Sequence, residues 1–123
     1  MFTGKYILSP MVRVGGLPFR LTCLHYGADL VYAEEVIAHR LLKSTKVINE
    51  TLGTVDFLDE DGGVCFRTTS EESDKVFFQM GVSDPEVAAQ AALMIEPHVA
   101  GRRFYRIELL FFSISNKLIK SIL

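Results

Sequence analysis

The chain has 123 residues and a formal net charge of −2, with 49% hydrophobic and 23% charged residues. This length allows one domain, and the composition is typical of a globular protein rather than a disordered one. The two cysteines, Cys23 and Cys65, stand far apart and outside any CxxC pattern. They predict neither a disulfide framework nor a zinc site, and they fit a reducing, cytoplasmic compartment. The N-terminus has no secretory signal pattern, and no apolar run reaches the roughly 18 residues of a membrane-spanning helix.

Charge is distributed unevenly along the chain. Residues 1–101, the body, carry 8 Lys and Arg against 14 Asp and Glu, a balance of −6. Residues 102–123, the tail, carry 5 against 1, a balance of +4. An acidic body gives no electrostatic footprint for nucleic acid, so a basic surface for RNA would have to lie elsewhere. The abrupt change after Gly101 predicts a boundary between two unlike segments.

The first part of the body predicts a strand, a helix and a second strand. Residues 6–8 and 30–33 are short β-prone runs that end in turn or polar residues, as buried strands of a parallel sheet do. Between them, Pro18 marks the first turn of a helix and Gly27 marks its end. The order and spacing are those of a right-handed parallel βαβ unit.

The middle of the body predicts a second helix and a hairpin. The helical stretch begins at Val36 and ends at Leu42 or continues to Asn49. Residues 54–58 and 64–67 are alternating runs around an Asp/Gly-rich turn, which predicts a β-hairpin or an exposed pair of loops. The polar residues 68–74 predict a surface loop.

The end of the body predicts a third strand and a third helix. The strand is expected over residues 75–81 because of its β-branched and aromatic content. The helix begins either with a capping box at Ser83 or with an Asp84 cap followed by Pro85. Its alanine-rich apolar face suits close packing on a sheet. Residues 98–101 should then lead into a fourth strand.

Three strand–helix units in succession predict an α/β fold, either doubly wound or a (β/α)8 TIM barrel. Periodicity alone does not choose between the two. A full barrel takes about 250 residues, so this chain would supply only the N-terminal part of one, truncated after about three strand–helix units. In both architectures, ligands bind at the carboxyl ends of the strands.

Polar or irregular residues stand at each predicted strand end. Residues 9–13 follow the first strand, where backbone N–H groups after Pro10 can meet an isoalloxazine ring or a phosphate. Gln79 ends the third strand and offers an amide donor and acceptor to a heterocycle, or alternatively serves only its own loop. Glu34 and Glu35 end the second strand; adjacent residues on an extended chain point to opposite faces, so at most one should face the site.

No other motif predicts chemistry. The three histidines lie in or beside predicted helices, and the two cysteines lie in a helix and in the presumed hairpin. Such residues are more often packing groups than ligands or nucleophiles. The chain has no GxGxxG, GxxxxGK[ST], HExxH or Ser-His-Asp pattern, and no metal site is predicted.

Four stretches of the body, which include the same strand ends, resemble one family. They are LSPMVRVGGLPFRLTCLHYGADLVYAEE (8–35), VINETLGTVDF (47–57), VCFRT (64–68) and VFFQMGVSDPEVAAQAA (76–92). Over roughly residues 5–101 the chain resembles the tRNA-dihydrouridine synthases, above all the eukaryotic cytosolic tRNA-dihydrouridine(20) synthase branch. The resemblance implies a flavin-binding TIM barrel that uses FMN and NADPH to reduce a uridine in the D-loop of tRNA.

The resemblance also implies roles for individual residues. Pro10, Met11 and Val12 match the backbone cradle of the flavin in that family, and Gln79 matches the side chain that hydrogen-bonds to the flavin ring. Arg13 is carried over as a neighbouring cofactor-binding residue. The acidic residues near the mouth of the flavin site correspond to Glu34 or Glu35.

The tail departs from the family pattern. After "VAG" the family continues as D-[IV]-N-x-G-C-P, with a cysteine that protonates the substrate carbon, and later segments bring a lysine, a histidine and phosphate-binding glycines. Here residues 102–106 read RRFYR, so no catalytic residue of the family is assigned to this chain. We therefore expect a truncated product that is inactive alone and arises from alternative splicing, intron read-through or an early-ending gene prediction.

Apolar residues recur in the tail at roughly helical spacing between Ile107 and Ile122, which predicts a helix with apolar residues on its other side as well. Such a helix needs burial. It would cover the open sheet edge of the partial barrel, promote association there, or lie on a membrane surface. Two alternatives to an enzyme follow: a non-catalytic interaction or regulatory isoform that pairs through its unfinished sheet, and an unstable product.

Overall fold

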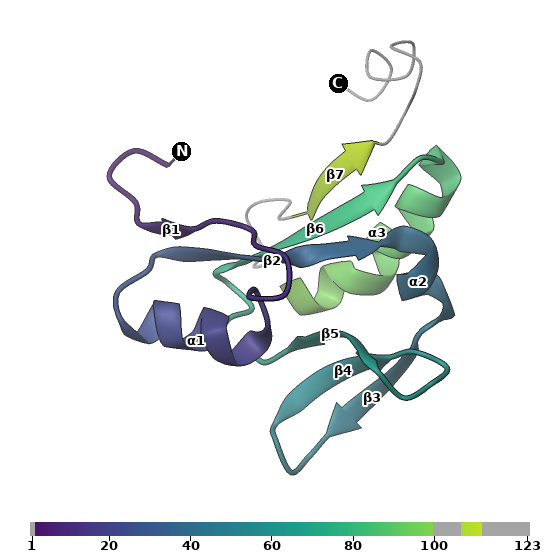
Figure 1. Cartoon of the computed structure of the whole chain (residues 1–123), viewed down its shortest axis with the longest axis horizontal. Coiled ribbons are helices and arrows are strands. Elements are labelled where there is room, and N and C mark those ends of the chain that lie inside the picture. The colour runs from purple at the N-terminus through teal and green to yellow at the C-terminus, as the bar shows by residue number, and fades with distance from the viewer. Residues whose placement is uncertain (1, 100–106, 112–123) are drawn as a thin grey trace.

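The computed structural model describes residues 2–99 and, for residues 107–111, the backbone alone. Strands and helices alternate at the start of the body, four strands then follow one another, and a third helix comes after them (Figure 1). The elements are β1 (Ile7–Leu8), α1 (Leu17–His25), β2 (Leu30–Ile37), α2 (Ala38–Lys43), β3 (Thr45–Asn49), β4 (Thr54–Leu58), β5 (Val64–Thr68), β6 (Val76–Val82), α3 (Pro85–Val99) and β7 (Ile107–Phe111).

The larger sheet has four parallel strands in the order β1-β2-β6-β7. Its first three strands in chain order are those predicted from the apolar runs, so the α/β fold is confirmed. The three helices lie on one face of this sheet (Figure 1). Within the part of the chain that the structure describes, the sheet does not close, and the fold is the N-terminal part of a (β/α)8 barrel.

The fourth strand comes from the tail. β7 lies parallel to β6, with Ile107 opposite Phe78 and Phe111 opposite Val82. The predicted helix is therefore wrong for residues 107–111. Their sequence, IELLF, is an apolar run that suits a parallel strand as well as a helix, and the free edge of β6 supplies the hydrogen bonds of a ladder. The rest of that predicted helix lies outside the described residues.

α3 corrects a second expectation. It continues to Val99, so residues 98 and 99, which were expected to lead into a strand, are helical. The remainder of that predicted strand lies at residues the structure does not describe. At the other end of α3, the Asp84 carboxylate accepts hydrogen bonds from the backbone N–H groups of Glu86 (2.8 Å) and Val87 (3.2 Å). Of the two proposed N-termini, the Asp84 cap with Pro85 in the first turn is the correct one.

The smaller sheet is antiparallel and has the order β3-β4-β5. The hairpin predicted from residues 54–67 is confirmed as β4 and β5. The helix predicted from Val36 to Leu42 is confirmed as α2, although β2 continues to Ile37 and the helix begins two residues later than expected. Its continuation to Asn49 is wrong, because Thr45–Asn49 form β3. The β-branched side chains at positions 45, 47 and 48 favour the extended backbone of a strand.

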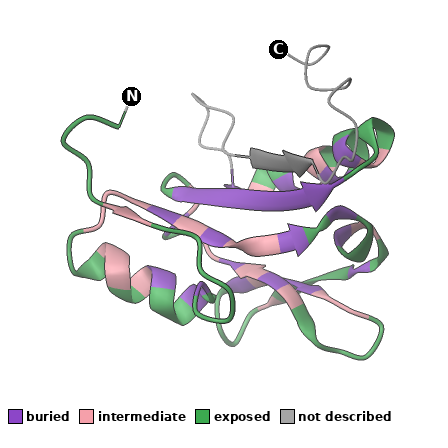
Figure 2. Ribbon diagram, turned by 45° about the horizontal axis from the view of Figure 1, so that its top comes forward, coloured by how far each residue is buried: buried purple, intermediate pink, exposed green. Residues whose placement is uncertain are grey.

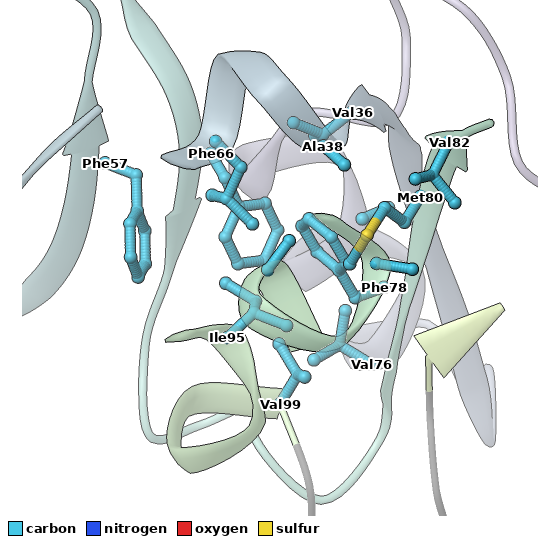
Figure 3. Close-up of a cluster of buried hydrophobic side chains, with 14 of the residues drawn as sticks. Val36, Ala38, Phe57, Phe66, Val76, Phe78, Met80, Val82, Ile95 and Val99 are labelled. Atoms are coloured by element: carbon cyan, nitrogen blue, oxygen red, sulfur yellow. The ribbon is translucent and has the colours of Figure 1, made fainter. Parts of the chain in front are cut away.

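One hydrophobic core joins both sheets to the helices. β6 is buried along its whole length (Figure 2). Phe66 of β5 meets Phe78 of β6 edge to face, with ring centroids 4.9 Å apart, and Ile95 of α3 lies beside them (Figure 3). This packing holds β6 rigidly and thereby fixes the positions of the polar residues on it.

None of the helices in the described residues is long and apolar enough to cross a membrane.

Candidate functional site

Side chains of β6 alternate between the two faces of the parallel sheet. Phe78 and Met80 belong to the core beneath the helices, which places Gln79 and Gly81 on the opposite face. On that face, closer to the start of the strands, Phe77 stacks on Tyr32 with ring centroids 4.8 Å apart. The face therefore changes from aromatic to polar toward the carboxyl ends of the strands, where ligands bind in barrel folds.

Gln79 is buried, and its side-chain amide has no hydrogen-bond partner among residues 2–99. Its residue exposure is 9%, and among residues 2–99 no group donates to or accepts from its amide. A primary amide has two N–H donors and an acceptor oxygen, and buried polar groups of this kind are nearly always paired. The alternative in which Gln79 serves only its own loop finds no partner in the described residues. An unpaired amide at this position fits a ligand with its own donors and acceptors.

Glu34 and Glu35 lie at an irregularity of β2. The strand register shifts between Tyr32 and Glu35, where β2 has one residue more than β6, and Glu35 comes to lie opposite Gln79. The extra residue breaks the two-residue alternation. Both residues line one cleft. The Glu34 side chain lies beside Gly15 and the Glu35 side chain beside Gly81, and the expectation that at most one of them faces the ligand site stays a prediction.

The β1–α1 loop, residues 9–16, folds against this part of β2. The backbone N–H of Arg13 donates to Glu34 Oε2 at 3.0 Å, and Arg13 itself has a left-handed φ of 65°. Within the loop, the carbonyl of Met11 accepts from the N–H of Gly15 at 3.2 Å. The side chains of Met11 and Val12 remain 37% and 79% exposed, so they are open to contact with a ligand.

A buried ion pair, which the sequence did not predict, holds the same loop from the helix side. Arg20 of α1 is 2% exposed and Glu72 is 0% exposed; they meet at Nε–Oε2 2.8 Å and Nη2–Oε1 2.5 Å. The guanidinium also donates to the carbonyls of Gly15 at 2.6 Å and Arg67 at 2.8 Å. The Thr68 hydroxyl donates to Glu72 Oε1 at 2.9 Å, so both ions are well satisfied.

A cleft of about 310 Å³ lies between the β1–α1 loop, β2 and β5. Cys65 is in its wall, and burial raises the pKa of the Cys65 thiol to about 11. The thiol is therefore protonated at neutral pH, which agrees with the prediction of an unreactive cysteine.

In the neighbouring sheet, hydrogen bonds from Arg67 hold the pKa of the buried Asp56 carboxyl below its usual value. Among the described residues, no cluster of three or more His, Cys, Asp and Glu could hold a metal ion.

The structure brings the predicted residues to one region. The β1–α1 loop, with Pro10 to Arg13, reaches β2 at Glu34, while Gln79 reaches β2 from the other side at Glu35. β2 lies between β1 and β6 in the sheet. The backbone of the loop and the amide of Gln79 thus flank the two adjacent glutamates in the carboxyl-terminal half of β2.

The described residues form an open parallel β/α sheet with helices on one face and polar groups near the carboxyl ends of its strands. Residues 7–101 match the dihydrouridine synthase (Dus) family. The chain therefore belongs to the dihydrouridine synthase family, as the resemblance of its strand-end motifs predicted.

Several curated relatives share this part of the family. The chain is 38% identical over 104 residues to the tRNA-dihydrouridine(20) synthase [NAD(P)+] of Schizosaccharomyces pombe, which covers 81% of this chain and 22% of that protein. It is 40% identical over 107 residues to the protein of the same name from Saccharomyces cerevisiae, covering 81% and 28%. A tRNA-dihydrouridine(20a/20b) synthase of S. pombe is 29% identical over 96 residues, covering 78% and 24%. The chain thus spans about a quarter of the length of these relatives.

Proposed function

We propose that the body is the N-terminal part of the FMN-binding barrel of a cytoplasmic tRNA-dihydrouridine synthase, in which NADPH drives the reduction of a uridine in the tRNA D-loop. In this proposal residues 1–101 form the partial flavin-binding domain, and residues 102–123 are a segment without family character that adds β7 to the edge of its sheet. The family match supports the chemistry, and the names of the relatives support tRNA as substrate and a nicotinamide dinucleotide as reductant.

The observation that carries the proposal is the buried amide of Gln79 on β6, for which residues 2–99 supply no hydrogen-bond partner. A flavin ring carries alternating N–H, N and C=O groups on its pyrimidine edge, which are complementary to a primary amide. The backbone of Pro10, Met11 and Val12 would meet the ring from the side of β1, and the exposed apolar side chains of the loop would contact its flat face. The Arg13 side chain would lie beside them. The backbone N–H of Arg13 already donates to Glu34.

When bound, FMN supplies the two-electron step by passing a hydride from the nicotinamide to the uridine ring. The described residues contribute binding and orientation to that chemistry. Glu34 and Glu35 add negative charge at the mouth of the site, and Glu34 also holds the loop through the backbone N–H of Arg13. The proton that completes the reduction has no donor assigned in residues 1–101.

Replacing Gln79 by Ala should weaken FMN binding at least tenfold. The change removes hydrogen bonds worth about 0.5–1.5 kcal/mol each, and about 1.4 kcal/mol is a tenfold change in Kd. Titrating FMN with the chain and following the quenching of flavin fluorescence measures this directly. Gln90→Ala is the matched control, because Gln90 is exposed on α3. Equal affinities for the Gln79 and Gln90 variants would contradict the proposal.

The polypeptide of residues 1–123, tested alone, should not reduce uridine even with FMN and NADPH supplied. The family's general acid is absent from its sequence, and proton transfer of this kind contributes about 10²–10⁴-fold to rate. Mass spectrometry of nucleosides from a tRNA transcript incubated with the polypeptide detects dihydrouridine. Product above a no-protein control would show that this polypeptide is catalytically sufficient.

The open sheet supports a second candidate, a non-catalytic isoform that associates through an unpaired sheet edge. β1 and β7 are the outer strands of the parallel sheet, and β3 is an exposed edge strand with Ile48 70% exposed. Unpaired strand edges favour pairing with another chain, including a second copy of the same one. A chain that forms complexes but binds no FMN would favour this candidate, so the flavin titration separates the two.

A further inference from the structure

We propose that Arg20 is a positioning residue: anchored by Glu72, it fixes the β1–α1 loop in the shape that receives the cofactor. The identity of that cofactor rests on the proposed function, whereas the hold on the loop rests on the geometry alone. Arg20 borders the cleft between the loop, β2 and β5, but its guanidinium is engaged by Glu72 and by the carbonyls of Gly15 and Arg67. It acts through the backbone of Gly15, the residue by which the loop enters α1.

The loop depends on polar ties for its order. In the β1–α1 loop, residues 9–16, every residue except Gly15 is exposed. Apolar packing therefore contributes little to the loop's conformation. The left-handed backbone of Arg13 is a conformation that non-glycine residues rarely adopt, and it persists where the surroundings impose it.

Two anionic groups impose that conformation from opposite sides. On the sheet side, Glu34 accepts the N–H of Arg13 and lies so close to Gly15 that a Cβ there would be 3.0 Å from Glu34 Cγ. On the helix side, Glu72 aligns the guanidinium of Arg20, which donates to the Gly15 carbonyl at 2.6 Å. The loop is thus fixed between a carboxylate of β2 and a buried arginine of α1.

The guanidinium is suited to this task because its donors diverge. One nitrogen reaches Gly15, another reaches both Glu72 and the carbonyl of Arg67, and the group lies 5.4 Å from the ring centroid of Phe66. The planar fork therefore ties the loop to β5 and to the turn at residues 69–74 at the same time. A lysine ammonium is a single point donor and cannot span these acceptors.

Arg20→Lys tests the inference, with Asp56→Asn as its control. The lysine retains the charge facing Glu72 but gives up the bond to Gly15. Asp56 is 2% exposed and paired with the partly exposed Arg67, so its variant disturbs a second, partly buried ion pair without touching residues 9–16. We expect both variants to lower the melting temperature. Only Arg20→Lys should speed hydrogen exchange at residues 11–16 and weaken FMN binding at least tenfold, while Asp56→Asn should change the Kd by less than about twofold.

The outcomes separate this inference from the proposed function. Equal loop exchange and equal FMN affinity in the two variants would show that Arg20 is merely structural. If the unmodified chain binds no FMN but Arg20→Lys still loosens the loop selectively, the positioning role stands and the proposed cofactor is wrong. Should Arg20→Lys not fold, Glu72→Gln takes its place: faster exchange at 11–16 than in β4 supports the inference, and unchanged exchange at 11–16 overturns it.

Discussion

Glu72→Ala is expected to destabilise the chain by about 3–5 kcal/mol, the range found when one partner of a buried ion pair is removed. Glu72 is fully buried and receives two hydrogen bonds from Arg20 and one from Thr68. Its removal leaves the guanidinium charged in an interior with few remaining acceptors. Urea unfolding followed by far-UV circular dichroism measures the loss, provided that the slope of the transition is unchanged.

The chain offers a matched control for this prediction. Arg40 and Asp59 form an ion pair as well, but Arg40 keeps a 52% exposed side chain. Exposed pairs contribute about 0.2–1 kcal/mol, so Asp59→Ala should cost no more than that. Similar losses for Glu72→Ala and Asp59→Ala would contradict the account of the buried pair.

Phe78→Ala should cost a similar amount, about 3–5 kcal/mol, for a different reason. The ring is 0% exposed at the centre of β6 and packs edge to face on Phe66 (Figure 3). Truncation removes buried apolar area and leaves a cavity that the surrounding strands and α3 cannot fill. Thermal or urea unfolding measures the effect.

Phe19→Ala is the comparison for the core prediction, because Phe19 is 38% exposed on α1. It should cost about 1 kcal/mol or less, as surface changes away from special features do. A loss for Phe78→Ala no greater than that for Phe19→Ala would mean that β6 is not the centre of the core.

The sequence predicted those parts of the fold that depend on local signals. β1, β2 and β6 follow from apolar runs, and the ends of α1 and α3 follow from Pro18, Gly27 and the Asp84 cap. Each of these signals acts within a few residues of the feature it predicts. Gln79 and the two glutamates were expected at strand ends, but β6 continues to Val82 and β2 to Ile37, so these residues lie two or three positions before the ends.

The remaining features depend on contacts distant in sequence. Arg20 and Glu72 are 52 residues apart, and the only local sign was that Arg20 shares a helix face with Leu17 and Leu24. The bulge in β2 is defined by its partner strand, so the sequence of β2 alone could not reveal that its register shifts next to the two glutamates. β7 took a strand conformation because β6 presents a free edge, which an apolar sequence with no clear period cannot reveal.

The central claim is that the β1–α1 loop and Gln79 bind the same flat ligand. Adding FMN to ¹⁵N-labelled chain and recording amide spectra tests it most directly. We predict that the side-chain NH₂ of Gln79 and the backbone amides of Met11 and Val12 shift together, with one saturation curve. Shifts confined to β3–β5, or none at saturating flavin, would contradict it.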